Sequence, residues 1–237
     1  MKRQVRVTFL GHSGFLMETA QHYLLFDYWT GDLPELRPGK PLYVFVSHSH
    51  HDHYNPEIYD FETELPQVSY ILSADVREAD SAWKNAGQVH FMKEHEEAVI
   101  GDCRVETLLS TDLGVAYLIE LDGLHIYHAG DLHWWEWPGE PEEENQAYIR
   151  NYKAELARMA GRKLDIAFVV LDPRQEWAGG RGMDAFLDQI GASYVYPMHL
   201  WEDYRLSKHY IDKNQKRYPD SQIMEIREAG QTWDILC

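Results

Sequence analysis

Short apolar runs rich in Val, Ile, Leu and aromatic residues recur along the chain, and turn-forming residues separate them. Such runs predict β-strands, and Asp122-Gly123 between two of them predicts a tight hairpin. The segment after Pro141 instead begins with acidic residues and ends near Gly161, which predicts a long helix. The pattern as a whole predicts an α/β protein. We expect strands at residues 5–10, 15–18, 23–27, 42–47, 69–72, 88–92, 103–109, 115–121, 124–128, 164–171, 192–196 and 223–226, and helices at 56–61, 75–84, 142–161, 183–190 and 204–217.

The length of 237 residues suits one domain with a substantial core, and no change of composition divides residues 1–237. The chain has 22 Lys and Arg against 39 Asp and Glu, a formal net charge of −17 that would repel a nucleic-acid backbone. No apolar run has the length of a membrane span or forms a signal-peptide core, and the two cysteines suggest no disulfide. We therefore expect a cytoplasmic protein whose partners are neither nucleic acid nor membrane.

Potential metal ligands are concentrated in one segment, His48-Ser49-His50-His51-Asp52-His53, directly after the apolar run 42–47. Alternate residues of an extended segment share a side, so His48 and His50 would point together, and the following turn would bring Asp52 and His53 round. Imidazole and carboxylate ligands suit zinc, manganese or iron. A solvated His-rich loop is the alternative interpretation, but a rigid preceding strand and an Asp inside the cluster favour a metal site.

The spacing His-x-His-x-Asp-His, followed by Gly130-Asp131 after one strand and His199 after another, resembles the metallo-β-lactamase superfamily over nearly the whole chain. Within it, the sequence looks most similar to stand-alone metal-dependent hydrolases related to ascorbate-6-phosphate lactonase. The resemblance implies a four-layer αββα sandwich with its ligand loops at one edge. It also implies catalytic roles for Asp52, which would orient the attacking water, and Asp131, which would bridge two metals. The metal ligands that it implies are His48, His50, Asp52, His53, Asp131 and His199.

The chain departs from the family at one ligand. The resemblance places a third His after the strand 103–109, where the sequence reads Leu109-Ser110-Thr111-Asp112-Leu113. Asp112 is the best substitute, because a carboxylate is a good zinc or manganese ligand and a neutral hydroxyl is a weak one. We therefore expect one divalent metal, zinc by preference, to be held firmly. A second metal near His48 and His50 would be weak or absent.

Several other residues near the predicted strand ends are open to two interpretations. Asp27 fits a carboxylate that orients a ligand His, and Asp172 fits either that role or a turn cap. A single His such as His12 is more often structural than functional. The aromatic residues Trp134, Trp135 and Trp137 lie just beyond Asp131 and could form a pocket wall, an oligomer contact or the cover of a helix. We expect one of them to line the substrate entrance.

These features predict a metal-dependent hydrolase that uses an activated water on a small-molecule ester, lactone or phosphoester. A phosphorylated sugar would need cations in the pocket. The alternative is a metal-binding, non-catalytic sensor or assembly module, for which the acidic surface and the Trp cluster are suited, and a homo-oligomer is possible. The candidate cations for a phosphate are Arg174, Arg181, Arg205 and Lys208.

Overall fold

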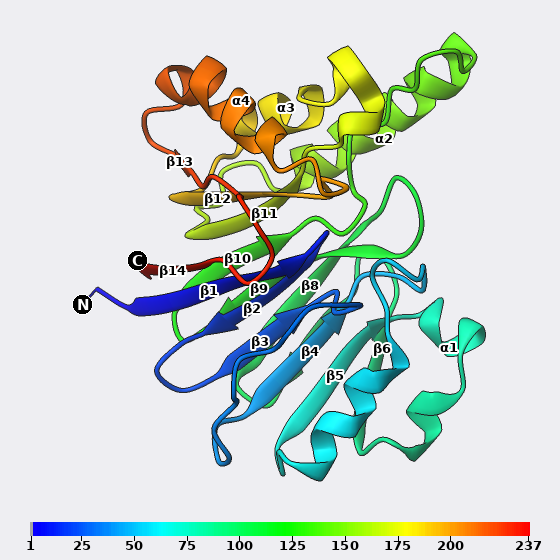
Figure 1. Cartoon of the computed structure of the whole chain (residues 1–237). Coiled ribbons are helices and arrows are strands. Elements are labelled where there is room, and N and C mark those ends of the chain that lie inside the picture. The colour runs from blue at the N-terminus through cyan, green and yellow to red at the C-terminus, as the bar shows by residue number, and fades with distance from the viewer. Residues whose placement is uncertain (1) are drawn as a thin grey trace.

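The structure is a computed structural model, and it describes residues 2–237. Two seven-stranded sheets pack face to face, and helices cover the outer face of each (Figure 1). The predicted four-layer αββα sandwich is therefore confirmed. The first sheet has the order β14-β1-β2-β3-β4-β5-β6 and the second has the order β13-β12-β11-β10-β9-β8-β7.

The elements follow the chain in two halves. The first sheet is built from β1 (Gln4–Gly11), β2 (Gly14–Glu18), β3 (Tyr23–Phe26), β4 (Leu42–Val46), β5 (Val68–Ser73), β6 (Gln88–Met92) and the C-terminal β14 (Thr232–Leu236). The second is built from β7 (Glu97–Ile100), β8 (Cys103–Leu109), β9 (Val115–Leu121), β10 (Leu124–His128), β11 (Ile166–Val170), β12 (Tyr194–Met198) and β13 (Gln222–Ile223). The α-helices are α1 (Val76–Ala79), α2 (Glu142–Arg158), α3 (Arg181–Gln189) and α4 (Arg205–Asn214); 3-10 helices span Pro56–Thr63, Ala82–Asn85, Pro173–Ala178 and Gln215–Arg217.

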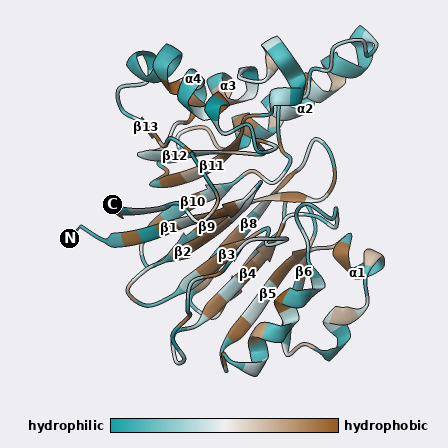
Figure 2. Cartoon of the chain, viewed as in Figure 1, coloured by the Kyte–Doolittle hydropathy of each residue, from teal (hydrophilic) through white to brown (hydrophobic). Residues whose placement is uncertain are grey.

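One apolar core fills the space between the two sheets. Phe26 and Phe45 stack with ring centroids 5.1 Å apart, and Phe168 from the opposite sheet lies 5.4 Å from Phe26. A smaller apolar cluster, which includes Ile58, covers the outer face of the first sheet under the first 3-10 helix. Figure 2 shows the brown strands between largely teal outer helices. Apolar runs buried on both faces therefore became central strands, as their sequences predict.

The sheet topology brings loops together at one edge of the sandwich. Strands β3 to β6 are parallel, and so are β10 to β13. The carboxyl ends of neighbouring parallel strands meet at the same sheet edge, where ligand sites of α/β proteins form. The loops after β4, β10 and β12 carry all the His and Asp residues of the predicted site except Asp112, which follows β8, and the loop after β11 carries Asp172.

Two predicted elements differ most clearly from the structure. The helix expected at 75–84 breaks at Asp80, whose backbone is extended and whose carboxylate accepts hydrogen bonds from the backbone N–H groups of Ser81 and Ala82. Such a local acceptor competes with the helix and starts a new turn. The strand expected at 223–226 is only the two-residue β13, and the last long strand is β14, which pairs antiparallel with β1. The edge strand β7 was also not expected from the sequence. Among residues 2–237, no helix combines the length and the apolar character that a membrane crossing requires.

Candidate metal centre

The His-rich loop begins where β4 ends, and the core holds it in place. His48 and His53 are fully buried, while His50 has a half-exposed side chain. The backbone N–H groups of His53 and Tyr54 both donate to the carbonyl of His50, which closes the turn that the sequence predicts. The carboxylate of Asp75 accepts a hydrogen bond from the backbone N–H of Ser49 at 2.8 Å. Hydrogen bonds within its own backbone and to Asp75 at the start of α1 therefore stabilise the loop.

Asp131 lies at the centre of the cluster. Its Oδ1 is 3.3 Å from Nε2 of His53 and 3.4 Å from Nε2 of His199, and its Oδ2 is 3.7 Å from Nε2 of His48. Asp131 follows β10 and His199 follows β12, so three loops from both sheets deliver these side chains. The carboxylate predicted to bridge two metals thus stands between three imidazoles.

Four overlapping sets of side chains have ligand atoms close enough to share a metal ion. In each set, the atoms lie within 4.8 Å of one another. The sets contain every predicted ligand, and His12 joins them. They are His12, Asp52, His53 and His199; His48, His50 and Asp52; His48, His53 and Asp131; and His50, Asp112 and Asp131.

The donor atoms of this cluster fit a divalent cation. Nε2 of His12, His48 and His53 and Oδ1 of Asp131 are buried, and none makes a hydrogen bond within the described residues. Leaving buried polar atoms without partners costs free energy, so their convergence calls for a common partner. Inward-facing nitrogen and oxygen atoms at one point are what zinc or manganese binds.

Burial sets the protonation states that a metal requires. It lowers the pKa of His48 and His53 well below the usual value, and it lowers that of His199 to about 4. These imidazoles are therefore neutral near pH 7, as ligands must be. Burial, together with the nearby carboxylates of Asp112 and Asp52, raises the pKa of Asp131 well above its usual value. A cation at this point would offset that repulsion and favour the carboxylate.

The outward ring nitrogens of the ligand imidazoles are held by second partners. Nδ1 of His53 lies 2.8 Å from Oδ2 of Asp27, which also accepts a hydrogen bond from the Ser47 hydroxyl. Nδ1 of His199 lies 2.9 Å from Oδ2 of Asp172. Such carboxylates fix the ring so that Nε2 faces the metal. Asp27 has the position expected of an orienting carboxylate. Asp172 has both of the roles considered for it. It contacts Nδ1 of His199, and it also accepts a hydrogen bond from the backbone N–H of Arg174 and so caps the following turn.

Only Asp112 among the possible substitutes for the missing His faces the cluster. Its Oδ2 lies 3.8 Å from Nδ1 of His50. The Thr111 hydroxyl instead donates to the backbone carbonyl of His133 at 2.7 Å, and the Ser110 hydroxyl accepts from the backbone N–H of Asp112. The geometry thus places Asp112 where the sequence predicts the substitute ligand, although the binding of metal by any of these residues stays a prediction.

His12 is the site residue that the sequence interpretation underrated. It is buried with a positive φ of 52°, and its Nε2 lies 3.3 Å from Oδ2 of Asp52. Its backbone carbonyl accepts a hydrogen bond from the N–H of His199, so the first turn of the chain joins the last ligand loop. The only sequence signal was the Gly-His-Ser-Gly turn itself, because the contact is between distant parts of the chain. His51, by contrast, lies outside all four sets and packs near Trp29.

Two glycines let the second sheet approach the His-rich loop. A Cβ on Gly114, whose φ is +71°, would lie 2.1 Å from the carbonyl oxygen of Ser47 and 2.6 Å from Cβ of His48. A Cβ on Gly130, whose φ is +50°, would lie 2.6 Å from Cβ of Ser47. Glycine is required at both positions for conformation and for space. The close approach keeps Asp112 and Asp131 within reach of the loop.

The three neighbouring Trp residues have different surroundings. Trp135 is buried, donates from Nε1 to the backbone carbonyl of Asp131, and has its ring 5.7 Å from that of His199. Trp137 stacks on Trp135 at 5.3 Å. Trp134 lies under the ammonium of Lys153. Trp135 and Trp137 therefore form a wall beside the cluster, while Trp134 faces α2.

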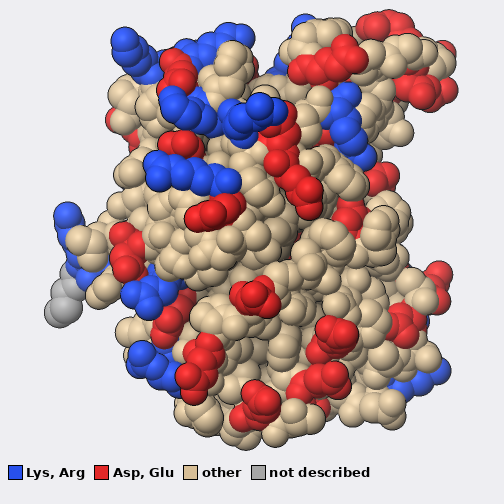
Figure 3. Space-filling view, viewed as in Figure 1, with Lys and Arg blue, Asp and Glu red and all other residues tan. Residues whose placement is uncertain are grey.

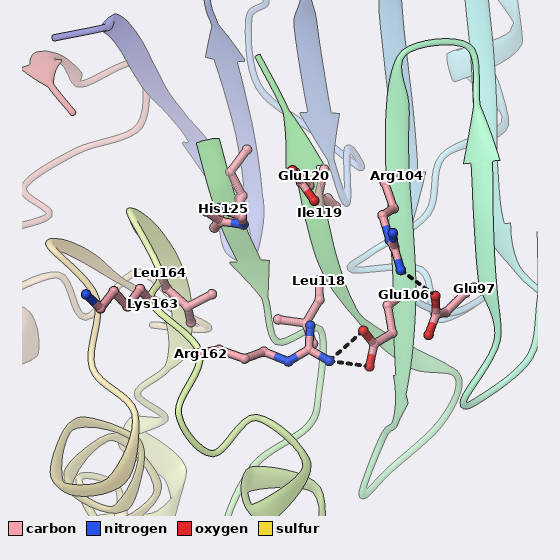
Figure 4. A pocket seen from close by; sticks show the side chains of 11 residues that line it. Glu97, Arg104, Glu106, Leu118, Ile119, Glu120, His125, Arg162, Lys163 and Leu164 are labelled. Atoms are coloured by element: carbon pink, nitrogen blue, oxygen red, sulfur yellow. Dashed lines mark hydrogen bonds and ion pairs between the residues drawn. The ribbon is translucent and has the colours of Figure 1, made fainter. Parts of the chain in front are cut away.

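A cavity of about 400 Å³ lies elsewhere, on the outer face of the second sheet (Figure 4). Both of its arginines are already paired: Arg162 donates to both carboxylate oxygens of Glu106, and Arg104 donates to Glu97. None of its lining residues belongs to the His and Asp cluster. This cavity is therefore separate from the His and Asp cluster, and its size is no evidence that it is the active site.

The fold and the cluster define a class of protein: an αββα sandwich with a His- and Asp-rich cluster at its edge that could hold a metal ion. A family model described as the β-lactamase superfamily domain matches residues 6–199. The chain belongs to this family, so the predicted superfamily is confirmed. The narrower resemblance to ascorbate-6-phosphate lactonase stays a prediction.

Individual proteins of known name or structure are also similar to this chain. A UPF0173 metal-dependent hydrolase of Korarchaeum cryptofilum is 32% identical over 135 residues, which is 54% of this chain and 60% of that protein. The chain thus matches about three fifths of this relative's length. The metallo hydrolase Igni18 of Ignicoccus hospitalis has a similar structure, with a TM-score of 0.62, 16% identity and 98% of both chains covered. Zinc-bound PqqB of Methylobacterium extorquens gives a TM-score of 0.56 at 11% identity, covering 98% of this chain and all of that one. These two structures support the fold.

Proposed function

We propose that this protein is a metal-dependent hydrolase that acts on a small-molecule ester, lactone or phosphoester. The observation that carries the proposal is the convergence of buried, unpartnered ligand atoms from His12, His48, His53 and Asp131. The UPF0173 relatives, which are described as metal-dependent hydrolases, support it.

The ligand sets suggest two unequal metal positions, with zinc the preferred ion. Asp131 would be shared between them. A bound divalent metal would supply Lewis-acid chemistry: it would acidify a water molecule and polarise a carbonyl or phosphoryl oxygen. One position would use Asp52, His53 and His199, with His12 beside them, and the other would use His48, His50 and Asp112.

The chain's own residues would then manage the proton. Oδ2 of Asp52 is a suitable acceptor for a hydrogen bond from the attacking water. The nearby imidazoles of His12 and His53 hold the pKa of Asp52 low against the effect of burial, so this carboxylate is ionised near pH 7. His12, 3.3 Å away, is placed to hold or pass on a proton. The buried wall of Trp135 would keep bulk water from the opposite side of His199.

We propose a small molecule as the substrate because of the charge of the surface. The formal net charge is −17. Figure 3 shows Lys and Arg gathered toward the helical upper part of one face, intermixed with acids, while Asp and Glu predominate below. Such a surface disfavours nucleic acid. A cytoplasmic location and a homo-oligomer stay predictions.

The test is a metal analysis followed by a substrate screen. The purified protein should contain a divalent metal and hydrolyse at least one member of a panel of lactones, phosphodiesters and thioesters. A chelator should abolish the activity, and zinc or manganese should restore it. His53→Ala should lose metal and activity, whereas His51→Ala, the matched control in the same loop, should keep both. If the protein binds no metal, or if the two variants behave alike, the proposal is wrong.

A further inference from the structure

The guanidinium of Arg174 is held beside the His and Asp cluster by one carboxylate and two aromatic rings, which we call its frame: Asp172, Trp137 and Trp201. It lies in the 3-10 helix that follows β11. Its Nε lies 3.0 and 2.9 Å from the two carboxylate oxygens of Asp172, and its Nη2 lies 2.5 Å from Oδ2 of the same residue. The guanidinium carbon lies 4.5 Å from the ring centroid of Trp201 and 5.3 Å from that of Trp137. Such a bidentate, stacked arginine has one preferred orientation.

This frame borders the ligand cluster directly. Asp172, which holds Arg174, also holds Nδ1 of His199. The ring of Trp201 lies 4.7 Å from that of His12 and 5.7 Å from that of His199. Trp201 is 41% exposed and has a positive φ of 46°, so a strained backbone presents this large ring at the surface of the site.

One edge of the guanidinium remains available. Asp172 uses Nε and Nη2, and within residues 2–237 no group forms a hydrogen bond with Nη1. The Arg174 side chain is 44% exposed, so this edge can meet a ligand.

The other candidate cations are engaged with different partners. Arg181 donates to Glu136 and stacks on the exposed ring of Trp177. Lys208 pairs with Asp212 one helical turn away, and Arg205, which is almost fully exposed, pairs with Asp203. None of these pairs includes a residue of the ligand sets or a carboxylate that holds one of them.

We propose that Arg174 binds an oxyanion of the substrate through Nη1, so that this enzyme selects small molecules with a carboxylate or phosphate group near the scissile bond. The inference rests on the proposed hydrolase function. Arg174 is the substrate-recognition residue. The rings of Trp137 and Trp201 keep its guanidinium in a fixed orientation. The preference follows from charge, because Asp52, Asp112 and Asp131 of the cluster would repel an anion that is not paired with Arg174.

The test measures binding without turnover. The zinc-reconstituted protein is titrated with glycerol 2-phosphate and, separately, with succinate, while tryptophan fluorescence reports on the rings beside Arg174. Glycerol is the uncharged control. The protein should bind at least one of the two anions and not glycerol, and the tighter of the two identifies the preferred oxyanion.

Variants distinguish recognition from general charge. Arg174→Met should weaken anion binding by about tenfold or more, the loss expected for a charge-assisted hydrogen bond. Arg181→Met is the matched control, an arginine that is also stacked on Trp and paired with Glu, and it should bind within about twofold of the wild type. Trp201→Leu leaves the ion pair with Asp172 intact and should weaken binding by a smaller factor.

The metal content is measured for each variant. It separates a role of Arg174 in anion recognition from a role in keeping Asp172, and through it His199, in place for metal binding. Loss of anion binding with zinc retained supports the proposal. Unchanged binding in Arg174→Met, equal losses in both arginine variants, or loss of zinc alone would overturn it. Because fluorescence needs no turnover, a failure of hydrolysis and a failure of anion recognition remain separate results.

Discussion

At the scale of single residues, the metal centre depends on which atom of each side chain faces inward. Asp27 and Asp172 bind the Nδ1 atoms of His53 and His199, so the Nε2 atoms converge on Asp131. Orienting partners of this kind determine metal affinity without touching the ion. Two residue-scale predictions follow from this arrangement and from the place of Asp112.

Asp27→Asn should weaken metal binding by about 10–100-fold, because the new amide would present an N–H group to Nδ1 of His53 or to the Ser47 donors. Asn tolerates the positive φ of 40° at this position, so the backbone is not the cause. Metal titration by calorimetry measures the change. Asp75→Asn is the control, because its amide oxygen can still accept from Ser49, and it should bind metal normally. Equal losses would contradict the orienting role of Asp27.

Asp112→Ala should empty the weaker metal position, and Asp112→His should strengthen it, because the imidazole would restore the missing family ligand near His50. The metal-to-protein ratio, measured by elemental analysis after dialysis, should be lower in the first variant and higher in the second. The firmer position should be unaffected. Two equally tight metals in Asp112→Ala would show that another side chain completes the second position.

At the scale of elements, the site is a contact between the two sheets. The backbone N–H of Val115 at the start of β9 donates to the carbonyl of Ser47 at the end of β4, and Tyr117 on β9 donates its hydroxyl to the carbonyl of Val46. The hairpin β9–β10 then continues directly to Asp131. The separation of the sheets at this edge therefore sets the distance between the ligand loops.

Gly114→Ala tests this close approach. A Cβ there meets backbone atoms of Ser47, and the positive φ adds strain, so we expect a loss of stability of about 2–5 kcal/mol and weaker metal binding. Gly139→Ala has a similar positive φ but no atom within 4 Å, so it should lose only about 1–2 kcal/mol and keep its metal affinity. Denaturant unfolding with metal titration compares them. Equal effects would mean that the contact is not important.

At the scale of the whole molecule, one core joins the sheets, and Cys103 reports on it. Cys103 is fully buried, and burial raises the pKa of its thiol to about 12. Cys237 is partly exposed, and burial raises the pKa of its thiol less, to about 11. At pH 8, a thiol reagent should therefore modify Cys237 and leave Cys103 unmodified until global unfolding. Counting modified thiols along a denaturant curve checks this. Fast modification of Cys103 in the native protein would mean that the sandwich opens locally at β8.

The sequence by itself determined the apolar strands, the hairpin at Asp122-Gly123 and the ligand motif from His48 to His53. These are local signals, since a strand run, a turn pair and a motif are read within a few residues. The absence of a His at residues 109–113, where Asp112 is the expected substitute, was also visible in the sequence. The breaks and ends of short elements were not, because they depend on single competing hydrogen bonds, as at Asp80.

Only the tertiary structure decided which distant residues complete the site. His12 reaches Asp52 because the first turn of β1 and β2 packs against the loop after β12, and Trp201 covers His12 because the backbone there is left-handed. Arg174 was one of several possible cations, and its partners Asp172, Trp137 and Trp201 set it apart. Periodicity describes the surroundings of a residue along its own strand or helix. Contacts between loops depend on how the two sheets pack, which no local pattern contains.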